Sequence, residues 1–298
     1  MVMDDAMIVL GFEGSRDQTE KLAAQLQVPF DLIKVHRFPD GESCVTVPIG
    51  LPETVVFMLS LDQPNQKLIE LLLAESAARK HGCKKSVLVA PYLCYMRQDI
   101  EFEPGQAISQ LIIGDLLSRC FDTVITIDPH LHRIKSLDEA FTHCEAISLS
   151  AAGLIGTHLS NNAENTILVG PDEESEQWVK VAAKHSGMPW CVASKVRSGD
   201  RNVKVALPKV DFQGKHAILL DDVISSGHTM KEAAEALLEA GCTRVDAACT
   251  HALFAAGAEQ ALKASGVNSV ISCNSIPHQS NRIDLSPLFA ETLRARLY

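Results

Sequence analysis

The sequence predicts an α/β protein made of two tandem domains, each a mainly parallel sheet flanked by helices. Short runs rich in valine and isoleucine alternate with amphipathic stretches along the chain. Several of these runs are continuously apolar, which suits parallel strands that are covered on both faces. The alternation of strand and helix runs through twice, so two sheets are expected rather than one. The length of 298 residues agrees, at about 150 residues per domain.

The same patterns predict the individual elements in chain order. The expected strands are Met7–Gly11, Ile33–Phe38, Thr54–Ser60, Ser86–Pro91, Thr123–Asp128, Thr166–Gly170, Trp190–Ser194, Ala217–Asp221, Arg244–His251 and Ser269–Asn274. The expected helices are Asp17–Leu26, Asn65–His81, Ala107–Cys120, Ser148–Leu159, Glu174–Ser186, Thr229–Ala240, Ala255–Ser265 and Pro287–Tyr298. Gly82 and Gly241 suit the left-handed position that follows a helix C-terminus.

A domain boundary is expected between Cys144 and Ser150, before the second series of strands begins. We therefore predict an N-terminal domain at residues 1–147 and a C-terminal domain at residues 148–298. No Gly/Ser-rich linker marks the boundary, which favours closely packed domains. The last helix could return to either domain and is a candidate to pack on the N-terminal one.

The composition excludes several classes of protein. Lysine and arginine total 27 against 37 aspartates and glutamates, a net charge of −10, whereas binding to nucleic acid or to an anionic membrane needs a basic face. No apolar run is long enough for a transmembrane helix, and the acidic N-terminus lacks the basic start of a signal peptide. Nine cysteines without a CxxC pair indicate reduced thiols. We expect a cytoplasmic protein with small-molecule ligands, and no nucleic acid or membrane among its partners.

The most informative segment leads from an apolar strand through two acids into a small-residue loop and a helix. It comprises Asp221, Asp222, Val223, Ile224, Ser225, Ser226, Gly227, His228 and Thr229. Ligands of open α/β sheets bind beyond the carboxyl ends of the strands. A loop that opens a helix offers free amides and a positive dipole end to a phosphate. The acidic pair then suits sugar hydroxyls or Mg²⁺, whereas an ordinary N-capped helix would leave the two acids unexplained.

This segment resembles the ribose-phosphate-binding loop of the type I phosphoribosyltransferase fold. Together with the doubled chain and four more motifs, it resembles the phosphoribosyl pyrophosphate synthetase (ribose-phosphate diphosphokinase) family. The resemblance implies two tandem phosphoribosyltransferase-like domains. It implies an enzyme that transfers the pyrophosphoryl group of ATP to the C1 hydroxyl of ribose 5-phosphate, with Mg²⁺, giving phosphoribosyl pyrophosphate and AMP for nucleotide biosynthesis. It assigns ribose 5-phosphate binding to Asp221, Asp222, Ser225, Ser226, Gly227, His228 and Thr229.

The motif from Arg37 to Glu42 resembles the adenine-binding loop of that family. The resemblance implies that Phe38 stacks on the base, that Asp40 and Glu42 accept hydrogen bonds, and that Gly41 completes the turn. The residues alone fit a plain surface hairpin equally well. In the family this loop usually serves the site of a neighbouring subunit, so a homodimer or a higher homo-oligomer is implied.

Two further strand ends carry residues for the ATP phosphates. After Ser86–Pro91, the resemblance places Arg97 and Gln98 on the phosphates, and the planar fork of arginine suits such a contact. After Thr123–Asp128, it makes His130 a catalytic residue and a Mg²⁺ ligand. A lone histidine is more often a structural hydrogen-bonder. Asp172 is implied as the second Mg²⁺ ligand.

The pair Lys195 and Arg197 resembles the cations of the family's flexible catalytic loop, which meet the transferring phosphoryl group. Residues two apart on an extended strand point the same way, so both cations can face one site. The residues alone would also fit a solvated basic turn.

Some positions depart from the family pattern. Ile100 and Glu101 stand where most relatives are basic, and Glu173, Glu174 and Glu176 replace glycines and neighbouring residues after Asp172. These departures support an alternative, a catalytically weak or inactive relative that acts as a regulatory or binding subunit. A transferase that consumes phosphoribosyl pyrophosphate is a second alternative, although it would need a base-binding hood and no ATP motifs.

Overall fold

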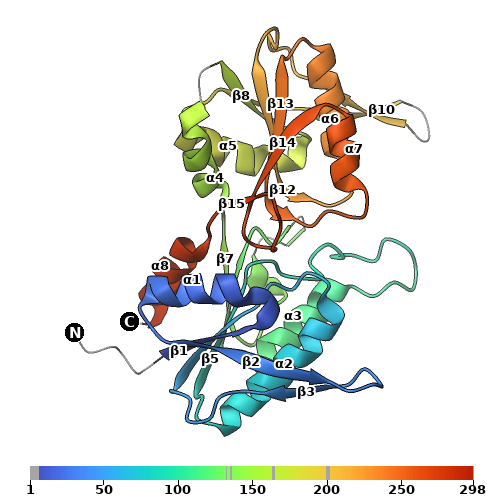
Figure 1. The fold of residues 1–298 in the computed structure, drawn as a ribbon. Coiled ribbons are helices and arrows are strands. Elements are labelled where there is room, and N and C mark those ends of the chain that lie inside the picture. Colours follow the sequence, from blue (N-terminus) through green and yellow to red (C-terminus); the bar gives the residue numbers. More distant parts are fainter. Residues whose placement is uncertain (1–6, 132, 135, 163–164, 199–201, 298) are drawn as a thin grey trace. The chain divides into compact units, whose positions relative to one another are not determined.

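The computed structural model describes residues 7–131, 133–134, 136–162, 165–198 and 202–297. They form two compact units (Figure 1). The first contains the chain up to Leu149 and from Leu285 onward, and the second contains Ser150–Asp284. Each unit is a mainly parallel sheet with helices on its faces, so the predicted fold class is confirmed.

The first unit has a seven-stranded sheet in the order β3-β2-β1-β4-β5-β6-β7. Its strands are β1 (Met7–Phe12), β2 (Phe30–Arg37), β3 (Ser43–Thr46), β4 (Thr54–Met58), β5 (Lys85–Ala90), β6 (Thr123–Ile127) and β7 (Glu145–Leu149). All neighbours pair in parallel except β2 and β3, which form an antiparallel hairpin. The central strands are almost wholly buried because the unit's helices cover both faces.

Those helices are α1 (Arg16–Leu26), α2 (Pro64–Lys80), α3 (Ser109–Cys120) and α8 (Ser286–Leu297), with short 3₁₀ turns η1 (Glu13–Ser15) and η2 (Leu137–Glu139). Helix α8 packs beside α1 (Figure 1). Arg294 donates to the carbonyl of Gln25, and Arg296 pairs with Glu145 of β7 at 2.9 Å. The last helix therefore belongs to the first unit.

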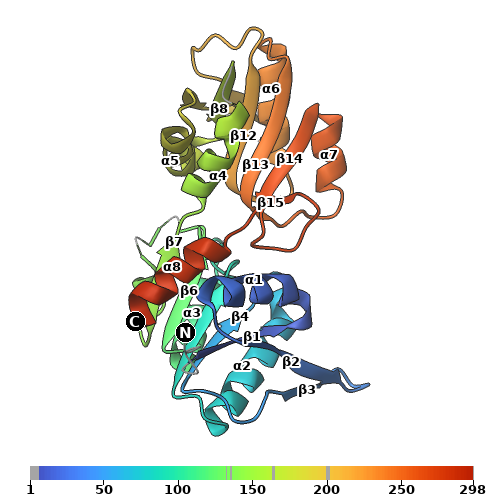
Figure 2. The same cartoon turned by 60° about the vertical axis from the view of Figure 1, so that its left-hand side comes forward.

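The second unit has a six-stranded parallel sheet in the order β15-β14-β13-β12-β8-β9 and a separate hairpin, β10-β11. The strands are β8 (Thr166–Gly170), β9 (Trp190–Val192), β10 (Ser194–Ser198), β11 (Asn202–Ala206), β12 (His216–Ile224), β13 (Arg244–Ala252), β14 (Val267–Cys273) and β15 (Asn281–Ile283). The helices are α4 (Ala152–Leu159), α5 (Glu176–Ser186), α6 (His228–Glu239) and α7 (Ala258–Ala264), with η3 (Ser160–Asn162) and η4 (Glu173–Ser175). Figure 2 shows α4 and α5 on one face of this sheet and α6 and α7 on the other.

Five short strands were not among the predicted ones, namely β3, β7, β10, β11 and β15. The helix predicted from Ser148 is wrong at its start, because Ser148 and Leu149 belong to β7 and the helix begins at Ala152. Strand β7 lies at the sheet edge and is only partly buried. It therefore lacks the continuous apolar run that marks a central strand.

All nine cysteines are free, and six of them are buried. Burial raises the pKa of the Cys94 thiol to about 12, so this thiol stays protonated and behaves as a small apolar side chain. Among the described helices, none has both the length and the apolar character needed to cross a membrane.

Candidate active site

In the second unit, the predicted acidic residues meet where the strand order reverses. Strand β12 pairs with β13 on one side and with β8 on the other. The strand order reverses between β8 and β12, because β9 lies outside β8 while β13, β14 and β15 follow outward from β12. Such a reversal is the usual ligand site of an open α/β sheet. Asp172 follows β8 directly, and Asp221 and Asp222 lie in the last part of β12. Asp172 and Asp222 are buried.

Lys195 of the hairpin strand β10 reaches this acidic group. Its Nζ lies 2.6 Å from Oδ2 of Asp172. Partial burial lowers the pKa of Lys195, but the hydrogen bond to Asp172 and the charges of Asp172, Glu174 and Asp221 outweigh that and raise it overall. The lysine is therefore held as a full cation beside the carboxylates.

For the carboxyl group of Asp221, the charged form is disfavoured overall. Burial and the neighbouring charges of Asp222 and Asp172 raise the pKa of Asp221 well above its ordinary value. Among the described residues, the carboxylates of Asp172, Asp221 and Asp222 thus lie together beside one lysine, so that negative charge is in excess there. An arrangement of this kind is typical of a functional site and favours binding of a further cation or of hydroxyl donors.

The predicted phosphate loop follows immediately. Its start is bonded to the segment that follows β13, because the carbonyl of Ile224 accepts from the amides of Leu253 and Phe254 at 3.1 and 3.0 Å. Gly227 then has a left-handed φ of 73° and caps α6. Since glycine has no side chain to cap the helix, the first amides of α6 face the loop. The dipole of the helix makes this a favourable place for a phosphate.

The side chain of His228 does not turn into this loop. It is exposed, and its Nε2 lies 3.2 Å from Glu232 one turn along α6. The part of His228 that lies at the helix start is its backbone amide, which is 3.5 Å from Ser226 Oγ. Ser225 and Thr229 are partly buried beside it.

Replacing Gly227 by alanine should weaken ribose 5-phosphate binding and destabilise the unit. A side chain there would have a disfavoured φ of +73° and would meet Leu262 at 3.3 Å. The left-handed conformation alone costs about 1–2 kcal/mol. Isothermal titration with ribose 5-phosphate and thermal unfolding measure the two effects.

Gly187→Ala is the matched control, because Gly187 has a φ of +74° with nothing within 4 Å of an added Cβ. It should lower the Tm and leave ribose 5-phosphate binding unchanged. Equal binding losses in both variants would contradict the role of the loop.

Arg197 lies two residues after Lys195 on β10, where it pairs with Val203 of β11. Its side chain is outside the described part of the structure, and so are residues 199–201. A common direction for the two cations therefore stays a prediction.

In the first unit, backbone strain gathers beyond the carboxyl ends of the strands. Four non-glycine residues with positive φ follow strands of this sheet: Gln63 after β4, Tyr95 after β5, and Asp128 and His130 after β6, with φ values of 49°, 60°, 38° and 56°. Such conformations are costly and concentrate at functional sites. The predicted residue His130 is thus one of a strained group, and it is partly buried.

Arg97, Gln98 and Asp99 lie in the loop that follows β5. Arg97 is exposed. The Gln98 amide donates to Ile100 O at 3.3 Å and to Gln106 Oε1 at 3.1 Å, so it braces its own loop.

Arg133 connects this loop to the one after β6. Its Nη1 lies 2.6 Å from Oδ1 of the buried Asp99 side chain, and its guanidinium lies 5.6 Å from the ring of Phe102. Sequence reasoning gave Arg133 no role, because nothing local links it to a partner 34 residues away.

The predicted adenine loop is the tip of the β2-β3 hairpin. Phe38 N donates to Glu42 O at 2.8 Å, and Gly41, with a φ of 92°, donates to Phe38 O at 2.9 Å. One oxygen of Asp40 accepts from the Glu42 amide at 3.1 Å. Phe38 is 43% exposed, so its side chain is accessible for stacking.

Comparison with known proteins identifies the family of this chain. Residues 7–120 match the family described as the N-terminal domain of ribose phosphate pyrophosphokinase, and residues 139–289 match the phosphoribosyl transferase domain family. A ribose-phosphate pyrophosphokinase of Methanopyrus kandleri is 32% identical over 290 residues, covering 96% of this chain and 98% of its own. The chain belongs to the ribose-phosphate pyrophosphokinase family.

Other relatives agree. Ribose-phosphate pyrophosphokinase 2 of Archaeoglobus fulgidus is 32% identical, with 86% of this chain and 89% of the relative covered. The crystal structure of phosphoribosylpyrophosphate synthetase from Mycobacterium smegmatis superposes with a TM-score of 0.82 at 25% identity, covering 98% of each chain. The predicted family is confirmed over nearly the whole length.

Directly after Asp172, Glu173 and Glu174 lie in η4, and Glu176 is the first residue of α5. Glu173, Glu174 and Glu176 are exposed, and Glu174 is one of the charges that raise the pKa of Lys195. Trp178 is buried in α5, so its side chain packs in the interior.

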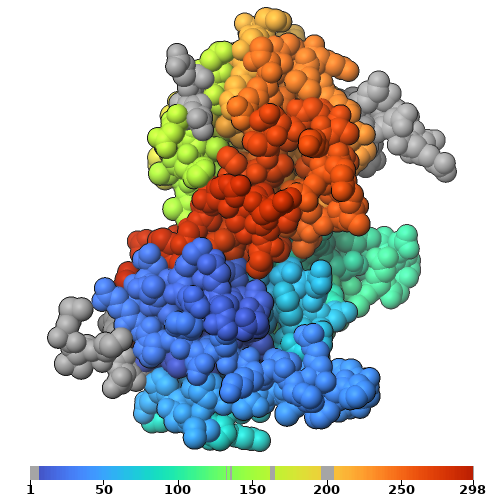
Figure 3. Space-filling view, in the orientation of Figure 1, coloured from blue at the N-terminus to red at the C-terminus, as the bar shows by residue number. Residues whose placement is uncertain are grey.

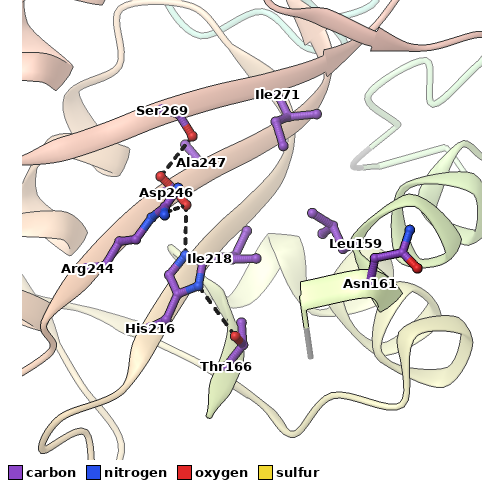
Figure 4. A pocket seen from close by; sticks show the side chains of 10 residues that line it. All are labelled: Leu159, Asn161, Thr166, His216, Ile218, Arg244, Asp246, Ala247, Ser269 and Ile271. Atoms are coloured by element: carbon purple, nitrogen blue, oxygen red, sulfur yellow. Dashed lines mark hydrogen bonds and ion pairs between the residues drawn. The ribbon is translucent and has the colours of Figure 1, made fainter. Parts of the chain in front are cut away.

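A cavity of about 380 Å³ opens near the amino ends of β12 and β13, at the opposite edge of the sheet (Figure 4). It contains a hydrogen-bonded network around the buried Asp246. His216 Nε2, Arg244 Nε and Ser269 Oγ each lie 2.8 Å from an oxygen of Asp246, and Asn268 donates at 3.1 Å. None of these residues was predicted to matter.

Replacing Asp246 by asparagine should destabilise the protein by about 1–3 kcal/mol near neutral pH, because its partners lose a charged acceptor. Burial alone would raise the pKa of Asp246, but its four hydrogen-bond donors outweigh burial and lower it. A lowered pKa contributes stability above the unfolded-state pKa and loses it as pH falls through the folded-state pKa. The Tm difference between parent and variant should therefore shrink below about pH 4. A difference that does not change with pH would contradict this explanation.

Proposed function

We propose that this protein transfers the pyrophosphoryl group of ATP to the C1 hydroxyl of ribose 5-phosphate, giving phosphoribosyl pyrophosphate and AMP for nucleotide biosynthesis. One observation carries the proposal. In this chain of the ribose-phosphate pyrophosphokinase family, Lys195 forms an ion pair with Asp172 close to Asp221. The pair lies beside the phosphate loop, where the strand order of the sheet reverses.

Ribose 5-phosphate is the ligand that the second unit suits. Its phosphate would bind the amides and hydroxyls of residues 225–229 at the start of α6. Its ring hydroxyls would donate to Asp221 and Asp222, which would relieve the charge crowding on Asp221. The sugar is thus held at both ends with its C1 hydroxyl free to react.

ATP would bind the residues of the first unit. The base would stack on the exposed ring of Phe38, with Asp40, Gly41 and Glu42 forming the polar side of that loop. Arg97 and Gln98 would meet the phosphates, together with His130. Since Gln98 already braces its loop, its contact requires an exchange of hydrogen bonds.

The acidic cluster fits Mg²⁺. Among the described residues, no group of three or more histidine, cysteine, aspartate or glutamate side chains is placed to hold a metal ion by itself. Mg²⁺ commonly takes one or two carboxylates and completes its shell with substrate phosphates and water, and the charge excess around Asp221 suits such an ion. We propose Asp172 as a Mg²⁺ ligand in the second unit and His130 as a Mg²⁺ ligand in the first. When bound, Mg²⁺ would neutralise charge on the phosphate oxygens.

The reaction itself depends on positioning and charge. The C1 oxygen forms a bond to the β-phosphorus as it loses its proton to water. The bond between the β-phosphorus and the oxygen that bridges it to the α-phosphorus breaks, and AMP leaves with that oxygen. Lys195 and Arg197 would bind the equatorial oxygens, where charge builds up in the transition state. Before substrates bind, the ion pair with Asp172 positions the Lys195 side chain.

We also propose that the protein is cytoplasmic and is a homodimer or a higher homo-oligomer. Helices α2 and α3 leave Ile69, Leu73, Leu111 and Ile112 exposed. Apolar surface of this kind on neighbouring helices is typical of an interface between subunits. Analytical ultracentrifugation measures the state, and a monomer at micromolar concentration would contradict it.

Incubation with ATP, Mg²⁺ and ribose 5-phosphate tests the function. AMP and phosphoribosyl pyrophosphate should form together, and omission of ribose 5-phosphate should stop AMP formation. No AMP across a range of Mg²⁺ and phosphate concentrations would overturn the proposal and leave a binding subunit without chemistry.

A further inference from the structure

The hairpin that carries Phe38 to Glu42 extends beyond the sheet of the first unit. Pairing of β1 with β2 ends at Phe12 and Ile33, while β2 continues to pair with β3 from Lys34–Thr46 to Arg37–Ser43. The outer half is therefore a two-stranded ribbon, and such ribbons are only marginally stable in water. Figure 3 shows this blue segment protruding at the surface. Its direction must be set by contacts other than the sheet.

The alternation along the ribbon decides which face makes those contacts. Val35 and Val45 are opposite each other and pack against the apolar core. Arg37 and Ser43 are two residues further toward the tip on each strand, so they share that inner face. His36 and Phe38 lie on the other face with their rings 4.9 Å apart, edge to face. The inner face meets α2, which runs beside β3 (Figure 1).

Glu70 of α2 is the residue that holds the ribbon near its tip. Its side chain is buried, with the whole residue 4% exposed. Its Oε1 accepts from Arg37 Nε at 3.2 Å and from Ser43 Oγ at 2.9 Å, one partner on each strand. A buried carboxylate is costly unless it is hydrogen-bonded, and here both bonds come from the last pair before the loop.

We propose that Glu70 is a positioning residue for the nucleotide loop. The inference rests on the proposed function, since it assumes that Phe38–Glu42 binds the base of ATP. Glu70 does not touch the base; it fixes the neck of the loop so that the Phe38 ring is presented in one orientation. Without this clamp the ribbon has several orientations, and only the fraction in the competent one binds ATP.

Glu70→Gln tests the proposal, because glutamine keeps the shape and an acceptor for Ser43 but removes the charge that Arg37 pairs with. KM for ATP should rise about tenfold, while kcat and KM for ribose 5-phosphate stay within about twofold. Hydrogen exchange in residues 34–46 should accelerate. This second readout does not depend on turnover.

Glu75→Gln is the matched control on the same helix. Glu75 is 7% exposed and likewise binds one arginine and one serine, Arg79 at 2.6 Å and Ser86 at 3.1 Å, but its partners are not in the ribbon. It should lower the Tm without changing KM for ATP or exchange in residues 34–46. Equal effects of the two variants on KM for ATP would overturn the role of Glu70. A parent protein that forms no AMP would instead overturn the proposed function, so the two failures are distinguishable.

Discussion

Replacement of Lys195 by alanine should lower kcat about 10²- to 10³-fold, the usual loss when one preorganised electrostatic contact to a transition state is removed. The Nζ of Lys195 lies 2.6 Å from Oδ2 of Asp172. The pKa of Lys195 is raised by the neighbouring carboxylates, chiefly that of Asp172. A contact made mainly in the transition state affects kcat more than KM. Steady-state kinetics with ATP and ribose 5-phosphate measures both constants.

Lys184→Ala is a suitable control for this variant. It removes a cation from the exposed side of α5 in the same unit and should leave both constants unchanged. Turnover of Lys195→Ala close to that of the parent would show that the lysine only neutralises Asp172 and takes no part in the chemistry.

Replacement of Asp221 by asparagine should impair activity and yet stabilise the ligand-free protein. The folded-state pKa of Asp221 is raised, mainly by burial and then by Asp222 and Asp172. The folded protein therefore binds this proton more tightly than the unfolded chain, and stability is lost as pH rises through the folded-state pKa. Because asparagine has no proton to lose, the variant avoids that loss at neutral pH, and its free energy of unfolding should be higher by an amount on the order of 1 kcal/mol. Its KM for ribose 5-phosphate should rise because a hydroxyl acceptor is lost.

The matched comparison is Asp246→Asn in the same sheet. The chemical change is identical, but the pKa of Asp246 is lowered where that of Asp221 is raised. Thermal unfolding at pH 7 should therefore shift in opposite directions, up for Asp221→Asn and down for Asp246→Asn. A fall in Tm for both would mean that Asp221 is a structural residue rather than a strained part of a binding site.

The central strands could be predicted from the sequence because burial on both faces leaves a continuous apolar run, as in Thr166–Gly170. The edge strands of the first unit, β3 and β7, could not, since they are short and half-exposed. The phosphate loop was recognisable because its chemistry is contiguous in the chain, from Asp221 to Thr229.

Residues that act through distant partners left no local signal. Glu70 looks like any helical glutamate until β2 and β3 are seen to pair beside it. Asp246 gains its importance from donors on β12 and β14 as well as on its own strand. The orientation of the His228 ring is decided by Glu232 one turn along the helix. Such contacts are created by the tertiary fold.

The most direct test of the central claim is ³¹P NMR of a reaction that contains ATP, Mg²⁺ and ribose 5-phosphate. AMP and phosphoribosyl pyrophosphate should accumulate in equal amounts, with the β- and γ-phosphorus of ATP still joined in the product. Accumulation of ADP with a ribose bisphosphate would show transfer of a single phosphoryl group and contradict the account, as would ATP that remains unconsumed.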